Sequence, residues 1–372
     1  MEKYKDQLMT TESPLVVFEN NAIGRMKKEI WDASADEIDT ILAEYGVPSP
    51  LEWTKVGSYI QTTPRYQLVE NRRKNDIVLI PVGCTENHGM HMASYSDTLY
   101  VSAIVEGVRR YTAKKGAPVN LALPPLNYGG HPYHHIGMPG TVVVRDQIVI
   151  GMMVDVMLGL WNDGFRKQII VNNHGQLWLL EAAIHEFTKK YQLPGYFRVI
   201  DWHRAVREFF VPKELGGKDF VSNFVHADEA ETAFSLLLAP ETVDMNYAVD
   251  TESPPTYFPG GHMDTSVDPY GRPSRWSETE GHMAIELYGR PEGVVGKAAQ
   301  ATAQKAKRPM AAILRYLTLL CEEILEAFPA GQVPPVEMTT LRDPEEMKPY
   351  LLEPQSPGWK SVYGLPQIGQ IQ

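Results

Sequence analysis

The chain has 372 residues, of which 43% are hydrophobic and 22% charged, the composition of an ordinary soluble globular protein of one large domain or two. Its 46 acidic and 35 basic residues give a formal net charge of -11, and no basic block stands out. The surface that would neutralise phosphates is therefore missing, and we expect no nucleic-acid partner.

The cysteine content and the apolar runs point to the cytoplasm. The two cysteines, Cys84 and Cys321, are too few for a disulfide framework. The charged N-terminus has no apolar stretch after it, so no signal peptide is predicted. The longest apolar run, residues 147–161, contains Asp155 and is too short to span a bilayer. We therefore predict a cytoplasmic protein without a membrane partner.

Strand and helix patterns alternate through the middle of the chain. The first 75 residues are mixed, with a helical pattern at 36–45 that Ser34 or Asp36 would cap. Four short apolar runs then predict buried strands at 76–82, 119–123, 167–171 and 196–200. Helical patterns lie between them at 99–111, 147–161 and 177–191. This alternation predicts an α/β fold with a mainly parallel sheet.

The last third of the chain differs in composition and residue pattern. A segment at 247–285 is rich in Pro, Gly and Ser but also carries Tyr257 and Trp276, which predicts an ordered, functional insertion that closes over a pocket. Residues 298–325 have a helical pattern, and eight prolines from Pro329 onward predict an extended tail. We expect three parts: an N-terminal extension at 1–75, a catalytic domain at 76–326 and a proline-rich tail at 327–372.

Polar side chains gather where the predicted strands end, which is where open α/β sheets bind ligands. Most of the 11 histidines lie at these positions or in one later segment, 226–231. The four strand ends are followed by Cys84, Glu86, His88, His91 and Asp97; by His131, His134 and His135; by Asn172, Asn173, His174 and Gln176; and by Asp201, Trp202 and His203. Scattered surface histidines would not produce this pattern.

The residue types indicate a metal centre. Glu, His and Asp together suit Zn, Mn or Fe. Glu86 and His88 are two residues apart, so both side chains point to the same side of an extended segment, and Asp97 comes just before the next helix, from where it can return as a bridging carboxylate. Two bridged ions generate hydroxide near neutral pH. The alternative is that these carboxylates merely cap helices and that His88 is an ordinary loop histidine.

Two further groups leave alternatives open. In the later segment, helical spacing pairs His226 with Glu229, or Asp228 with Glu231, and does not choose between these pairs. Cys84 is a candidate nucleophile, although neighbouring carboxylates would raise the pKa of its thiol and a small buried cysteine is the commoner case. No P-loop or GxGxxG motif supports a nucleotide cofactor.

The residues at 83–91 (GCTENHGMH), with Asp97 following, resemble the metal-binding signature of the creatininase (creatinine amidohydrolase) family. Three more blocks agree in order: 135–141 (HIGMPGT), 172–175 (NNHG) and 226–232 (HADEAET). This resemblance implies a three-layer α/β/α fold, two divalent ions (Zn and/or Mn) and a homohexamer.

The resemblance also implies roles for particular residues. Glu86 and His174 would hold one ion and His88 the other, with Asp97 as the bridge. Creatininase has a glutamate where this chain has Gln176, a poor ligand. Family members without that glutamate look to use the one that corresponds to Glu231. For the reaction itself we predict catalytic roles for His226 and His135, either of which could stabilise an enolate formed when the ring opens.

The substrate is expected to be a small polar ring. Gln176 argues against creatinine, and the long N-terminal extension with the HPYHH stretch at 131–135 looks more like the 3-dehydro-scyllo-inosose hydrolase branch of inositol catabolism. In that version a metal-activated hydroxide attacks a ring ketone, and a carbon–carbon bond breaks. A cyclic amide hydrolase, in which His226 protonates the leaving nitrogen, and a non-catalytic protein stabilised by its metals are the alternatives.

Overall fold

The computed structural model describes residues 8–13, 15–53, 55–124, 127–131, 137–252 and 292–368. Its main sheet has four parallel strands in the order β4-β3-β5-β6. The strands are β3 (Ile77–Val82), β4 (Asn120–Leu121), β5 (Lys167–Asn172) and β6 (Tyr196–Asp201). Every residue of β3 and β5 is buried, which explains why both strands form continuous apolar runs in the sequence.

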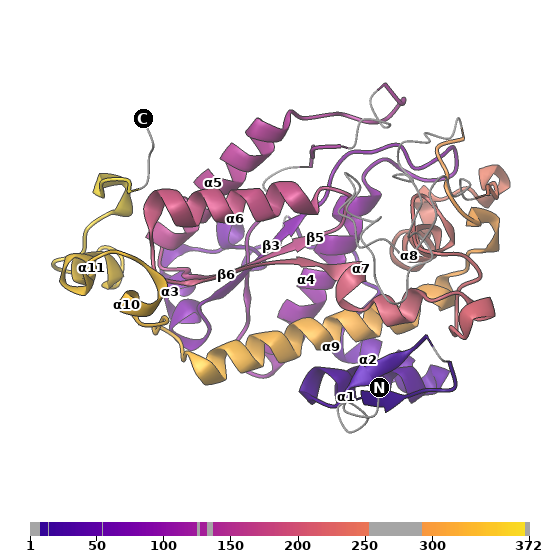
Figure 1. The fold of residues 1–372 in the computed structure, drawn as a ribbon, viewed down its shortest axis with the longest axis horizontal. Helices are drawn as coiled ribbons and strands as arrows, with labels where there is room; N and C mark the ends of the chain where they lie inside the picture. Colours follow the sequence, from indigo (N-terminus) through magenta and orange to yellow (C-terminus); the bar gives the residue numbers. More distant parts are fainter. Residues whose placement is uncertain are drawn as a thin grey trace.

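Helices cover both faces of this sheet (Figure 1). α4 (Ser96–Lys114) and α9 (Ala303–Ala327) lie on one side, and α5 (Asp146–Asn162) and α6 (Leu177–Tyr191) on the other. Alternate residues of β3 serve the two cores: Leu79 packs in the α4 and α9 core, whereas Val78 and Ile80 pack in the α5 and α6 core. The predicted three-layer α/β/α fold with a mainly parallel sheet is confirmed.

The N-terminal region packs against the long helix α9. It contains an antiparallel pair, β1 (Leu8–Thr10) and β2 (Val17–Glu19), followed by α1 (Ala22–Asp32), α2 (Ala35–Tyr45) and α3 (Arg65–Lys74). Both α1 and α2 contact α9. Ser34 caps α2 in a capping box with Glu37, so Ser34, and not Asp36, is the cap of the predicted helix.

The C-terminal tail is helical in two places, and the expectation of an extended tail is wrong there. α10 (Val336–Thr339) and α11 (Pro344–Leu351) lie at the end of the molecule opposite to α8 (Glu229–Leu238) (Figure 1). Arg166 fastens the tail, because its guanidinium donates to the carbonyls of Tyr350 and Leu351. Within the described ranges, no helix has the length and apolarity needed to cross a membrane.

The register of the strands sets the position of the site. Val82 pairs with Asn172, and Asn172 pairs with Asp201, so β3, β5 and β6 end level with one another. The short helix α7 (Trp202–Ala205) follows β6 directly. The residues just beyond these three ends therefore meet at one edge of the sheet.

Candidate metal centre

A glycine at the end of β3 allows the first turn of α4 to approach the sheet. A Cβ atom on Gly83 would lie 2.5 Å from the backbone nitrogen of Thr98, closer than any side chain permits. Asp97 is in that first turn and is buried. The chain thus leaves β3 through Glu86 and returns with Asp97 to the same point, as the sequence predicts.

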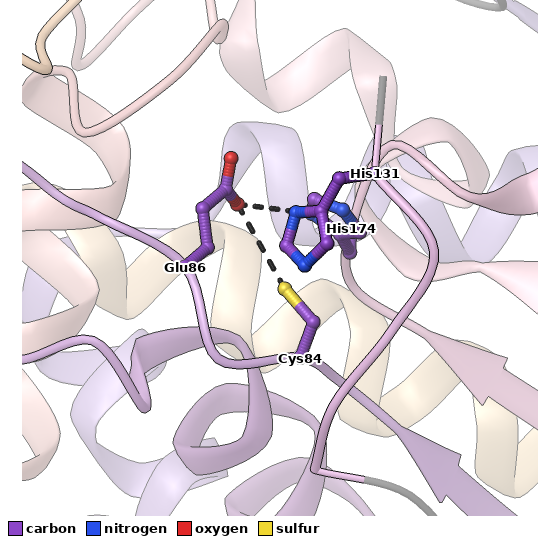
Figure 2. A group of neighbouring side chains, drawn as sticks. All are labelled: Cys84, Glu86, His131 and His174. Atoms are coloured by element: carbon purple, nitrogen blue, oxygen red, sulfur yellow. Dashed lines mark hydrogen bonds and ion pairs between the residues drawn. The ribbon is translucent and has the colours of Figure 1, made fainter. Parts of the chain in front are cut away.

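The first group of side chains forms around Glu86 and His174. Nδ1 of His174 lies 2.9 Å from Oε2 of Glu86 and 3.6 Å from Oδ2 of Asp97. Figure 2 shows Cys84 and His131 beside this pair. One ligand atom from each of Cys84, Glu86, His131 and His174 lies within 4.8 Å of the others. All four residues are buried.

The second group forms around His88. Its Nε2 atom lies 3.4 Å from Oε2 of Glu231 and 3.9 Å from Oδ1 of Asp97. Asp97 therefore presents one carboxylate oxygen to each group. This arrangement agrees with the predicted bridging position.

The start of α8 resolves the pairing that the sequence leaves open. Asp228 is the N-cap of α8 and accepts from the backbone nitrogens of Ala230 and Glu231. Glu229 faces away from the cluster and pairs with Lys305. Ala227 adopts a left-handed conformation with φ 46°, which turns the chain immediately before the cap. Glu231, in the first turn, is thus the carboxylate of this segment that reaches His88.

His226 precedes this helix and faces the same cluster. Its Nδ1 atom lies 3.5 Å from Oε1 of Glu86. Its Nε2 atom is 2.7 Å from the backbone carbonyl of Asn87. Because a carbonyl only accepts, Nε2 carries the proton and Nδ1 turns its lone pair towards the cluster.

Burial and mutual repulsion dominate the electrostatics of the cluster. Burial raises the pKa of Asp97 to about 7, and the Glu86 carboxylate adds to this rise. Burial also raises the pKa of the Cys84 thiol well above its usual range, with Asp97 and Glu86 acting in the same direction. Burial opposes the charge on His88, but the adjacent Glu231 carboxylate holds the pKa of His88 well above the ordinary value. Burial lowers the pKa of His131 to about 3.

The orientation of the histidines fits bound cations. Nδ1 of His88 contacts the carbonyl of Glu86 at 3.0 Å, and Nε2 of His174 contacts the carbonyl of Gly130 at 3.1 Å. A metal-ligating histidine commonly donates its second N–H in this way, which aims the other nitrogen at the ion. Nε2 of His88 is buried and makes no hydrogen bond to any residue that the structure describes. The donor set, three carboxylates with imidazoles, has the charge and chemistry for divalent metal ions.

Two predicted residues have other outcomes. His135 lies outside the described residues, as do 253–285 of the predicted insertion. Gln176 turns away from the metal groups: its Oε1 accepts from the nitrogen of Gly130 at 3.1 Å, and its Nε2 donates to the carbonyl of Gly83 at 3.2 Å. Gln176 is therefore part of the scaffold, in agreement with the sequence argument that it is no ligand.

Several residues at the site were not among the predicted ligands or catalytic groups. Asn173 donates to Asp97. The ring of His131 lies 4.5 Å from that of His174. His203 and Phe224 stack on each other and line the pocket beside Glu86 and Asp97. Their position after a strand end was the available signal for Asn173, His131 and His203, whereas Phe224 had none.

Comparison with known proteins agrees with this geometry. The fold and the site define a metal-dependent hydrolase, so the predicted enzyme class is confirmed. The family model for creatininase (creatinine amidohydrolase) matches residues 62–321. The chain belongs to the creatininase family.

Relatives and solved structures differ in how much of the chain they cover. The chain is 44% identical over 307 residues, 82% of its length, to a 3-dehydro-scyllo-inosose hydrolase of Thermotoga maritima, and covers 96% of that protein. It is 28% identical to a creatinine amidohydrolase of Pseudomonas putida over 195 residues, 49% of this chain and 71% of that protein. A solved structure described as "Creatininase Mn" has a TM-score of 0.55 at 20% identity, covering 73% of this chain and 99% of that one, which supports the fold.

Proposed function

We propose that this chain opens the ring of a small diketo-inositol, 3-dehydro-scyllo-inosose, by hydrolysing a carbon–carbon bond. The observation that carries the proposal is the 44% identity to a hydrolase named for that substrate, which extends over 96% of the relative. The metal-ligating groups at the sheet edge supply chemistry suited to this reaction.

We propose two divalent ions at this centre, zinc or manganese. Glu86, Asp97 and His174 would hold one ion, and His88, Asp97 and Glu231 the other. One group that can hold a metal contains His88, Asp97 and Glu231. Another contains Glu86 and His174, and Nδ1 of His174 lies 3.6 Å from Oδ2 of Asp97. When bound, such ions polarise a carbonyl and lower the pKa of water.

His226 is placed to move a proton. Burial lowers the pKa of His226, so the imidazole is neutral near pH 7 and its Nδ1 atom can accept a proton. The contact with the carbonyl of Asn87 at 2.7 Å fixes the ring so that Nδ1, and not Nε2, faces Glu86. The predicted role of His135 in stabilising the enolate stays a prediction.

The reaction balances without another reagent. The oxygen of one water forms a bond to the ketone carbon, and the bond from that carbon to the carbon between the two ketones breaks. The electron pair goes to that second carbon as an enolate, which the remaining ketone stabilises. His226 Nδ1 accepts a proton from the attacking water and returns it to the enolate carbon, which gives an open-chain keto acid.

A cyclic amide such as creatinine is the second candidate. The creatinine amidohydrolase relative supports it over only 49% of this chain. The hydrogen bonds that hold Gln176 in the scaffold argue against it, because creatininase has a glutamate ligand at this position by the family resemblance.

A direct assay tests the substrate. The purified chain, loaded with zinc or manganese, is offered 3-dehydro-scyllo-inosose and creatinine in parallel, and product formation is followed by mass spectrometry. We expect one water to add to the inosose and no turnover of creatinine. Turnover of creatinine with no change in the inosose would overturn the proposal in favour of the amide hydrolase, and a folded protein that binds no metal would overturn the metal centre.

Three further expectations belong with this function. We propose a homohexamer, which light scattering of the purified chain tests, and a cytoplasmic location. We also propose that residues 76–326 are the catalytic domain, with 1–75 and 327–372 as extensions. The contacts of α1 and α2 with α9 support an N-terminal extension that folds onto the domain.

A further inference from the structure

Cys84 lies inside the first metal group. Its sulfur is 2.8 Å from Oδ2 of Asp97 and 3.9 Å from Oε2 of Glu86. Figure 2 shows the sulfur directed at the space between Glu86 and His174. Cys84 has 0% of its surface exposed, so its sulfur faces ligand atoms rather than solvent.

Four donor atoms at this point have the spacing of one coordination sphere. They are the sulfur of Cys84, Oε2 of Glu86, Oδ2 of Asp97 and Nδ1 of His174. The sulfur lies 2.8 Å from the Asp97 oxygen and 3.9 Å from the Glu86 oxygen, and Nδ1 of His174 lies 2.9 Å from the Glu86 oxygen and 3.6 Å from the Asp97 oxygen. A tetrahedral zinc ion with bonds of about 2.0 to 2.3 Å keeps its ligands about 3.3 to 3.6 Å apart. Each of these four separations lies within about 0.5 Å of that range.

We propose that Cys84 is the fourth ligand of the ion held by Glu86, Asp97 and His174, and that this sulfur makes the position a zinc site. The inference rests on the metal centre of the proposed function. Thiolate is a soft ligand that favours zinc, whereas carboxylates and imidazole serve manganese equally well. The sulfur therefore distinguishes between two metals that the other ligands leave undecided.

The metal-free electrostatics do not oppose this assignment. Among buried carboxylates and without an ion, the Cys84 thiol keeps its proton. A bound divalent cation is the largest local charge and reverses this balance, so that a coordinating thiol releases its proton to solvent.

The proposal makes the two metal positions unequal. The position at Cys84 has four protein ligands, the pattern of a closed zinc site. The position of His88, Asp97 and Glu231 has three, the pattern of a site that keeps one place for water or substrate. His203 and Phe224 line the same pocket as Glu86, Asp97, His174 and Glu231. An ion at the position with four ligands would hold Asp97 in place as a ligand for the position with three.

Cobalt substitution tests the sulfur ligand by absorption. The full chain is stripped of metal with a chelator and titrated with Co²⁺. We expect an intense near-ultraviolet sulfur-to-cobalt band in the parent protein and in the Cys321→Ser variant, which retains Cys84. The Cys84→Ser variant should show no such band. Cys321 is the matched control, because it is also buried but lies in α9 within the hydrophobic core. In Cys84→Ser we expect zinc affinity to fall by more than about 10-fold, with little change for manganese.

The outcomes separate this inference from the proposed function. Two bound cobalt ions without a sulfur band in the parent protein would overturn the Cys84 assignment and leave the metal centre intact. Failure to bind cobalt at all would overturn the metal centre itself. If Cys84→Ser does not fold, X-ray absorption of the zinc-loaded parent decides: a sulfur shell at about 2.3 Å supports the assignment, and a shell of only oxygen and nitrogen overturns it.

Discussion

Nε2 of His88, just beyond β3, lies 3.4 Å from Oε2 of Glu231 in the first turn of α8. The other ring nitrogen of His88 is held by the carbonyl of Glu86 at 3.0 Å, which fixes the imidazole in this direction. Two segments far apart in the sequence thus aim complementary ligand atoms at one point. The carboxylate that faces His88 comes from α8 and not from the loop that carries Gln176.

The first prediction concerns this carboxylate. Glu231→Gln keeps the shape of the side chain but removes its charge, so the ion at His88 should be lost and hydrolysis should fall by about 100-fold or more. Metal analysis should find about one ion per chain in place of two. Glu241→Gln, an exposed change just beyond the same helix, is the control and should retain both ions. Full metal content in Glu231→Gln would remove Glu231 from the ligand set.

His226 should affect turnover without affecting metal content. His226→Gln removes the proton-accepting Nδ1 atom while leaving the metal ligands in place, and we expect kcat to fall by about 100- to 10,000-fold. Elemental analysis and the dependence of rate on substrate concentration separate the two roles. A parallel loss of metal would make His226 a ligand, as its place in a group with Glu86 and His88 would also permit.

Gln176 tests whether the creatininase ligand can be restored by substitution. In Gln176→Glu, an oxygen replaces the Nε2 group that donates to the carbonyl of Gly83 and to Oδ1 of Asn172, so three acceptors face one another in the core. We expect the free energy of unfolding to fall by about 1–3 kcal/mol or more, with no gain in creatinine hydrolysis. Gln147→Glu, exposed in the first turn of α5, should change stability by less than about 1 kcal/mol. Creatinine turnover by a stable Gln176→Glu protein would contradict this view.

The sequence predicts the scaffold well because burial alone determines it. The predicted strand at 167–171 agrees with β5 to within one residue, since β5 ends at Asn172. The prediction succeeds because both faces of β5 are buried. The strand at 119–123 shrinks to Asn120–Leu121, because it is an edge strand that pairs with β3 at only two positions. The prediction of an extended tail did not take Asp343 into account. Asp343 caps α11, and Pro344 occupies the first position of that helix, where proline is well tolerated.

The ligand set needs the tertiary structure. Spacing could not select Glu231, because the choice depends on where α8 begins, and this is fixed by the Asp228 cap and the left-handed Ala227. Nor could it place Cys84 against Asp97, since that contact requires the close approach of α4 to Gly83. The sequence alone predicts that Glu86 and His88 share a side and that Asp97 can return to them, whereas Glu231 is indicated only by the family resemblance.

Metal removal should give the protein an unusual pH dependence. In the metal-free chain, burial raises the pKa of Asp97 to about 7 and that of Asp228 to about 8, above the ordinary value of 3.8 for an aspartate. Between pH 4 and pH 8 the unfolded chain gives up these protons while the folded chain retains them, so rising pH favours unfolding. The raised pKa values of His88 and His174 act in the same direction, because their stabilising charge is lost as pH rises.

Thermal unfolding of the chelated protein measures this effect. We expect a higher Tm at pH 5.5 than at pH 8 for the metal-free chain. Addition of zinc at pH 8 should raise Tm, because ions bind the folded state and neutralise the carboxylates. A metal-free Tm that rises from pH 5.5 to pH 8 would show instead that the buried histidines with lowered pKa values, His91, His131, His203 and His226, dominate the pH dependence.

The opposite end of the sheet should govern stability and not chemistry. There Lys167 lies with 0% of its side chain exposed and 2.6 Å from Oδ1 of Asp76, whose other oxygen accepts from the nitrogen of Gly331 in the tail. Asp76→Asn leaves the ammonium buried without its counter-charge and should cost about 3–5 kcal/mol of unfolding free energy. Asp36→Asn, an exposed change at the start of α2, should cost less than about 1 kcal/mol.

The double variant isolates the cause of this loss. Lys167→Met combined with Asp76→Asn removes the uncompensated charge, and should recover part of the stability lost in Asp76→Asn. Denaturant unfolding gives the free energy of unfolding of the parent, of Asp76→Asn and of the double variant. The kcat of both variants, measured well below their Tm values, should stay within about twofold of that of the parent. A large fall in kcat for a folded Asp76→Asn protein would show that the two ends of the sheet are coupled. Without that fall, the Asp76–Lys167 pair contributes to stability and not to catalysis at the edge where β3, β5 and β6 end.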